Sequence, residues 1–150
     1  MGTINSLGSE RAAVVAVVDP DANTAAAYTS AYVSMSDFNQ VLAIVQTGVL
    51  GSSATVDFKL VQATDSGGTS SKDISGKAIT QLVKASNDDD QAVINCRSEE
   101  LDVANGFDYV AMVMTVGTAT SDTSAIMLGM TARYAPASDN DLASVQEIVS

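Results

Sequence analysis

The stretch that decides the fold is ATVDFKLVQA, residues 54–63, in which apolar and polar residues alternate. Val56, Phe58 and Leu60 fall on one side of this stretch, and Asp57 falls on the other. A period of two is typical of a β-strand that covers a hydrophobic core with one face and meets water with the other. The stretch therefore predicts a half-buried strand.

Seven other segments read as strands, because they alternate in the same way or are short apolar runs between turn residues. Residues 40–50 and 107–117 are apolar on both faces, which is expected of strands in the middle of a sheet. Residues 73–85 also fit helical spacing behind Asp73, but a strand agrees better with their surroundings. The seven segments are residues 14–18, 26–35, 40–50, 73–85, 91–97, 107–117 and 124–134.

Residues 124–134, with the sequence SAIMLGMTARY, are another clear alternation. Ile126, Leu128 and Met130 recur at every second position, so we expect them on the inner face of their strand. Together with Phe58 they would line one core.

Eight short strands separated by turns are typical of a sandwich or a barrel. We predict an all-β fold, an antiparallel sandwich of the jelly-roll type with about eight short strands and flexible terminal arms. An immunoglobulin-like sandwich is the alternative, but a single Cys and no Trp cannot supply the core signature of that fold. The predicted organisation is an N-terminal arm (residues 1–25), a β-sandwich domain (residues 26–136) and a C-terminal tail (residues 137–150).

The charge of the chain argues against two kinds of partner. Eighteen Asp and Glu against seven Lys and Arg give a formal net charge of −11, and the cations form no cluster. Nucleic acids and anionic membrane surfaces are both bound through clustered Lys and Arg, so we expect neither as a partner. No apolar run is long enough to span a bilayer, and the first 20 residues lack the order of a secretion signal. We therefore expect the protein to be made in the cytoplasm.

Groups suited to catalysis are scarce. The chain has no His and one Cys, so it offers no ligand set for zinc and no Cys–His pair. We expect Cys96 to be a small buried hydrophobic residue. The acidic residues fall mostly in stretches that read as turns, which leaves a carboxylate-based glycosidase as a weak hypothesis. We assign no catalytic, cofactor-binding or metal-binding residue and expect no enzyme activity.

Two tyrosines and two acidic loops are each compatible with a binding site or with a purely structural role. Tyr28 and Tyr32 would share a strand face and could contact a sugar, although aromatic residues are common in strands and packing is the favoured explanation. Acidic residues at 88–90 and in the loop of residues 65–73 could bind calcium, but their spacing is not that of an EF-hand loop and solvated turns explain them better.

Three stretches of the chain resemble small virion proteins of tailed bacteriophages, which include capsid decoration or cement proteins. The stretches are YTSAYVSMSDFNQVLAIVQTGVLG (residues 28–51), LDVANGFDYVAMVMTVGT (residues 101–118) and ARYAPASD (residues 132–139). The resemblance covers residues 26–139 and rests on the texture of strands and turns. It implies a non-enzymatic structural protein that binds the outside of the major capsid protein lattice and assembles with itself, for instance as a trimer. A carbohydrate-binding or receptor-binding jelly-roll module of a phage tail or fibre is the alternative.

The termini carry apolar residues on otherwise polar segments, and we expect the contact with a partner to concentrate there. An N-terminal apolar segment could add as a strand to a sheet edge. The C-terminal residues fit a helical stripe after Pro136, although a helix of that length is not stable alone. Folding back onto their own domain is the other outcome for both segments. The predicted partner-binding residues are Val14, Val15, Val17, Leu142, Val145 and Ile148.

Overall fold

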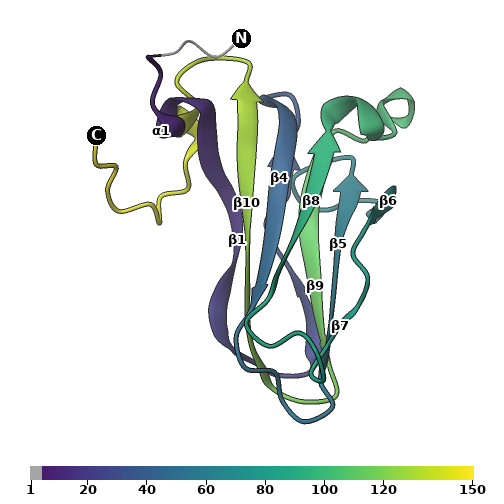
Figure 1. The fold of residues 1–150 in the computed structure, drawn as a ribbon. Coiled ribbons are helices and arrows are strands. Elements are labelled where there is room, and N and C mark those ends of the chain that lie inside the picture. Colours follow the sequence, from purple (N-terminus) through teal and green to yellow (C-terminus); the bar gives the residue numbers. More distant parts are fainter. Residues whose placement is uncertain (1–4) are drawn as a thin grey trace.

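The computed structural model describes residues 5–150, which form ten strands and four short helical turns (Figure 1). The strands are β1 (Ala12–Asn23), β2 (Ala26–Thr29), β3 (Val33–Ser34), β4 (Phe38–Thr47), β5 (Thr55–Ala63), β6 (Lys72–Ala78), β7 (Leu82–Val83), β8 (Gln91–Arg97), β9 (Tyr109–Gly117) and β10 (Ser121–Ala132). The helical turns are α1 (Gly8–Arg11), η1 (Ser98–Glu100), η2 (Val103–Asn105) and η3 (Ala137–Asn140). None of the helices described here is long and apolar enough to cross a membrane.

The strands pair antiparallel into two sheets that face each other (Figure 1). The first sheet has the order β1-β10-β4-β8, and the second has the order β2-β9-β5-β6, with β3 paired to β9 and β7 to β5. When β3 and β7 are set aside and the other eight strands are numbered along the chain, the orders become 1-8-3-6 and 2-7-4-5. This is the double Greek key of a jelly roll, so the predicted fold class is confirmed.

The hydrophobic core lies between the two sheets. On β5 the predicted alternation is correct, because Val56, Phe58 and Leu60 are at most 1% exposed while Asp57 faces solvent. The predicted central place of β9 is also correct, since this strand lies between β2 and β5. Cys96 is fully buried, as expected.

The predicted orientation of β10 is wrong. Ile126 and Leu128 lie on the outer face, whereas Ala125, Met127 and Gly129 face the core. The reason is steric, because a Cβ built on Gly129 would lie 2.6 Å from atoms of the Phe38 ring. The strand therefore turns Gly129 toward the Phe38 ring, and Ile126 and Leu128 point outward.

Both termini also differ from the expectation. Residues 12–23, assigned to an N-terminal arm, form β1 at the edge of the first sheet. The helical stripe expected in the tail does not form, because no helix continues beyond η3. The tail instead bonds to β1: the Leu142 N–H donates to the Val14 carbonyl at 2.9 Å, and the Val14 N–H donates to the Asp141 carboxylate at 2.6 Å. Residues 1–4 lie outside the described part of the chain.

Candidate interaction face on the outer side of the first sheet

The outer face of the first sheet carries apolar residues where solvent-facing residues are expected. Because β1, β10, β4 and β8 pair in register, their outward side chains lie in rows that run across the strands. Two adjacent rows are almost entirely apolar, and only Asn95 interrupts them. We call their seven apolar members the apolar rows: Val14, Leu128 and Leu42 in the upper row, and Val17, Ile126, Ile44 and Val93 in the lower row.

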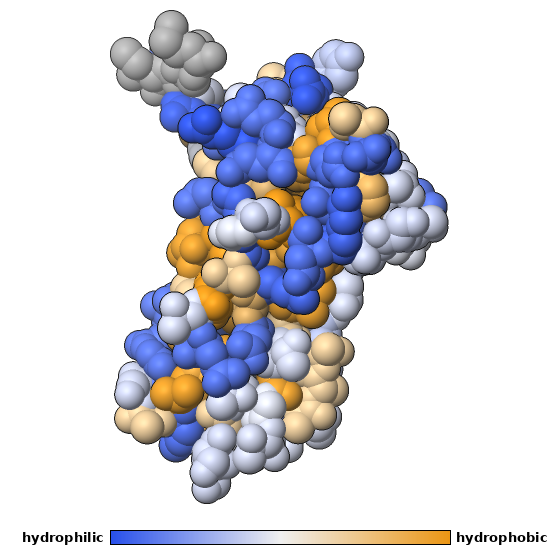
Figure 2. Space-filling view, turned by 90° about the vertical axis from the view of Figure 1, so that its right-hand side faces the viewer, coloured by the Kyte–Doolittle hydropathy of each residue, from blue (hydrophilic) through white to orange (hydrophobic). Residues whose placement is uncertain are grey.

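The apolar rows are exposed to different degrees. Val93 on the edge strand β8 is 52% exposed, and the other six residues are partly buried. Figure 2 views the molecule from the side of β8 and β6, and it shows hydrophobic areas at mid-height between hydrophilic ones. A contiguous apolar surface on a soluble domain commonly marks a site of interaction.

The outer face of the second sheet differs in character. Asp57 pairs with Thr115 there, and Lys59 pairs with Val113 and forms an ion pair with Asp73. Antiparallel sheets commonly have one face on the core and one polar face in water, and the second sheet fits that rule better than the first. The two outer faces of the sandwich are therefore not equivalent.

Two adjoining hollows lie along the first sheet, and we call them together the outer groove. One has a volume of about 250 Å³ and is lined by Val17, Ile44 and Ile126 of the lower apolar row. The other has a volume of about 510 Å³ and lies further toward the loop end of the sheet. Pro20, Gln46 and Ser124 line both hollows, so the groove is continuous from apolar to polar residues.

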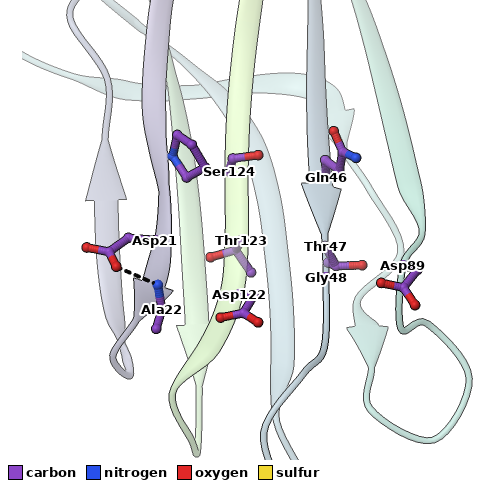
Figure 3. A pocket seen from close by; sticks show the side chains of 10 residues that line it. Asp21, Ala22, Gln46, Thr47, Gly48, Asp89, Asp122, Thr123 and Ser124 are labelled. Atoms are coloured by element: carbon purple, nitrogen blue, oxygen red, sulfur yellow. Dashed lines mark hydrogen bonds between the residues drawn. The ribbon is translucent and has the colours of Figure 1, made fainter.

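Carboxylates occupy the polar end of the outer groove. Asp21 comes from β1, Asp122 from β10 and Asp89 from the loop before β8 (Figure 3). We call these three residues the acidic row. The five ion pairs found among residues 5–150 all use other carboxylates. No group of three acidic, His or Cys residues in that range is placed to hold a metal ion. The acidic row is spread across the sheet. The Asp21 carboxylate accepts the Ala22 N–H at 2.7 Å and points away from Asp122 and Asp89, so the three residues offer separate charges (Figure 3).

The predicted partner-binding residues fall in two places. Val14 and Val17 belong to the apolar rows, while Val15 sits at a β-bulge and is 6% exposed. Leu142 lies against β1 through its bond to Val14, whereas Ile148 is 48% exposed near the chain end. Val145 is partly buried, and its own N–H donates to the Leu142 carbonyl to close a turn. The structure thus brings Val14 and Leu142 together and leaves Ile148 apart.

Sequence reasoning missed five residues of the apolar rows: Leu42, Ile44, Val93, Ile126 and Leu128. A signal for them was present, because residues 40–50 are apolar on both faces. A strand apolar on both faces is expected beneath another layer, and no strand of the described chain lies over β4 on its outer side.

The thiol and the loop carboxylates that were considered for catalysis or calcium binding are buried or bonded within the fold. Burial raises the pKa of the Cys96 thiol to about 11, which keeps it protonated. Hydrogen bonds from the side chain and then the N–H of Thr69, followed by the N–H of Gly67, lower the pKa of Asp65 within its own turn. The pKa of Asp88 is lowered first by its bond to Lys84 and then by the Leu50 N–H. These carboxylates hold turns together.

The two tyrosines do not form one stripe. β2 ends at Thr29, and the chain resumes pairing only at Val33, so Tyr28 and Tyr32 do not share a strand. The Tyr28 hydroxyl donates to the Thr24 carbonyl, and the Tyr32 hydroxyl donates to Ser71. Tyr28 is thereby tied to the residues just before its own strand, and Tyr32 to the loop between β5 and β6.

No protein-family model matches the chain, and no curated protein matches it. Among solved structures it is similar to a chain from the cryo-EM structure of Broad Bean Stain Virus, with 13% identity over 75% of this chain and 63% of that one and a TM-score of 0.40. A chain of a Cowpea Mosaic Virus empty virus-like particle has 11% identity, 89% coverage of both chains and a TM-score of 0.42. The xylanase Xylanase10C of Cellvibrio japonicus has 13% identity over 83% of this chain and 27% of that one, with a TM-score of 0.36. This chain thus spans less than two thirds of the first of these chains. Its jelly-roll fold follows from its own strand order.

Proposed function

We propose that this chain is a non-enzymatic structural protein of a virus particle, and more specifically a capsid decoration or cement protein of a tailed bacteriophage. In this role it binds the outside of the lattice formed by the major capsid protein and stabilises that lattice. It acts at the lattice as a homo-oligomer, for which a trimer is the simplest expectation. Its location is the exterior of the capsid.

The observation that carries the proposal is the pair of apolar rows on the first sheet. A cement protein works by burying surface against its neighbours, and each Å² of apolar surface removed from water contributes roughly 25 cal/mol. Such a role needs shape and uncovered apolar surface, and it needs no reactive group. The phage context comes from the resemblance of residues 26–139 to small virion proteins.

The net charge of −11 supports a place on the outer side of the shell. Packaged DNA is densely negative and repels an acidic protein, because nothing on this chain gathers cations to replace the counterions of DNA. The outer surface of a capsid imposes no such repulsion.

Cryo-electron microscopy of the particle produced with the gene for this chain tests the proposal. We expect density for the jelly roll on the capsid exterior, and its loss from particles made after deletion of that gene. Those particles should also release DNA at a lower temperature than the parent particles. Absence of the protein from virions, or its presence only on the tail, would sink the proposal.

A further inference from the structure

We propose that the outer groove binds an extended segment of a partner protein that presents apolar side chains to the apolar rows and Lys or Arg side chains to the acidic row. The inference concerns the chemistry of the face and holds whether or not the partner is a capsid protein.

The spacing of the face fits a strand-like segment. Leu128, Ile126, Ser124 and Asp122 follow one another at every second position of β10, and each marks one row. Two residues of an extended chain advance by roughly 6.6–6.8 Å, whether they belong to β10 or to a segment lying along it. Alternate side chains of the segment therefore meet successive rows. This predicts two apolar residues two positions apart and a cation four positions from the nearer of them, after or before the pair according to the direction of the segment.

The charge of the groove selects a basic occupant. None of the five ion pairs found in the described chain uses Asp21, Asp89 or Asp122. A second copy of this chain would bring another net charge of −11 to this face. Complementary charge speeds encounter and suppresses wrong partners, so the acidic row favours a segment with Lys or Arg over self-association.

Selection from a displayed library of random twelve-residue peptides tests the proposal without any capsid. The wild-type protein is the target, and the Val93→Lys variant is used to discard peptides that bind elsewhere. Val93 is 52% exposed on an edge strand, so the variant should keep the fold. We expect enriched peptides to carry two apolar residues two positions apart and a Lys or Arg four positions from the nearer of them, on the same side of the pair throughout.

A synthetic peptide of the enriched sequence then serves as the probe for affinity measurements by calorimetry. Val93→Lys should weaken its binding by about tenfold or more, since it places a cation within the apolar row. The triple variant Asp21→Asn, Asp89→Asn, Asp122→Asn keeps the shape of the groove, and Asn tolerates the positive φ of 59° at Asp89. It should weaken binding about fivefold at about 0.05 M salt and have no effect at about 1 M salt, where charges are screened.

Thr115→Lys, on the central strand of the second sheet, is the matched control and should bind the peptide like the wild type. The proposal is overturned if no basic and apolar sequence is enriched, or if Val93→Lys binds the enriched peptide as tightly as the wild type. It is also overturned if sedimentation velocity shows a wild-type dimer that Val93→Lys converts to a monomer, because the occupant would then be a second copy.

Discussion

Gly129 shows how one residue decides which side of a strand faces the core. The Phe38 ring, 1% exposed, fills the space where a Cβ at position 129 would stand. Period-two alternation predicts that Ile126 and Leu128 share a face, and they do. It does not say which face is inward when both are apolar, because that choice depends on a ring from a distant strand.

At this scale we expect truncations on the two faces of the sandwich to differ in cost. Leu60→Ala should lower the free energy of unfolding by about 2–5 kcal/mol, because it leaves a cavity in the core. Ile126→Ala should cost less, because its side chain is only partly buried and its loss opens no enclosed cavity. Urea denaturation of both variants gives the comparison, and equal costs would mean that another layer covers the outer face.

The carboxylate of Asp102 links stability to pH. Its hydrogen bonds to Lys72 and then to Asn105 lower its pKa below 3.8. A depressed pKa in the folded state adds stability above the unfolded pKa, and that stability is lost as the pH falls through the folded pKa. Asp102→Asn should therefore lower the urea midpoint at pH 6, and its difference from the wild type should shrink as the pH falls below 3.8. Asp19→Asn, whose carboxylate has no bond or ion pair in the described chain, is the control. This assignment is wrong if the difference in urea midpoint between the wild type and Asp102→Asn stays constant with pH.

At the scale of elements, uninterrupted sequence patterns predicted the strands well. Segments near the chain ends, where the pattern is interrupted, were predicted poorly. β5 matches its predicted segment because its residues alternate without a break. β4 and β9 are apolar on both faces, and they lie within three residues of their predicted segments, as β8 does. β1 runs on through Pro20, beyond the predicted segment of residues 14–18, because a bulge between Val18 and Asp21 accommodates the proline. The tail reads as a helix in sequence, but its bonds to Val14 hold it extended, and sequence spacing cannot reveal a partner so far along the chain.

Deletions at the two ends should have opposite effects. Removal of residues 1–25 takes away β1, whose Ala13, Ala16 and Val18 are buried, so we expect the remaining chain to unfold. Removal of residues 143–150 keeps both bonds between the tail and Val14, so the domain should stay folded. Circular dichroism and thermal melting distinguish the results. A folded domain after the first deletion would restore the idea of a detachable N-terminal arm.

At the scale of the whole molecule, the two outer faces of the sandwich differ, because the first sheet carries the apolar rows and the second sheet is more polar. The fold class and the scarcity of catalytic groups could be inferred from sequence, because both depend on local pattern and on composition. The outer groove could not be inferred, because its lining comes from residues far apart in sequence that only the pairing of β1, β10, β4 and β8 brings together. Val14 and Val17 were found only because they lie in an apolar stretch near one end.

The contact between the tail and β1 also limits how the molecule can polymerise. Asp141 and Leu142 occupy the backbone groups of Val14 on the β1 edge, while β8 at the opposite edge pairs with β4 and with no other strand among residues 5–150. An incoming strand can therefore extend the first sheet more readily at β8 than at β1. Two copies joined through β8 would make one continuous sheet bounded on both sides by β1. Further growth would have to add a strand at β1, where the tail occupies the backbone groups of Val14, so this route favours closed pairs over fibres.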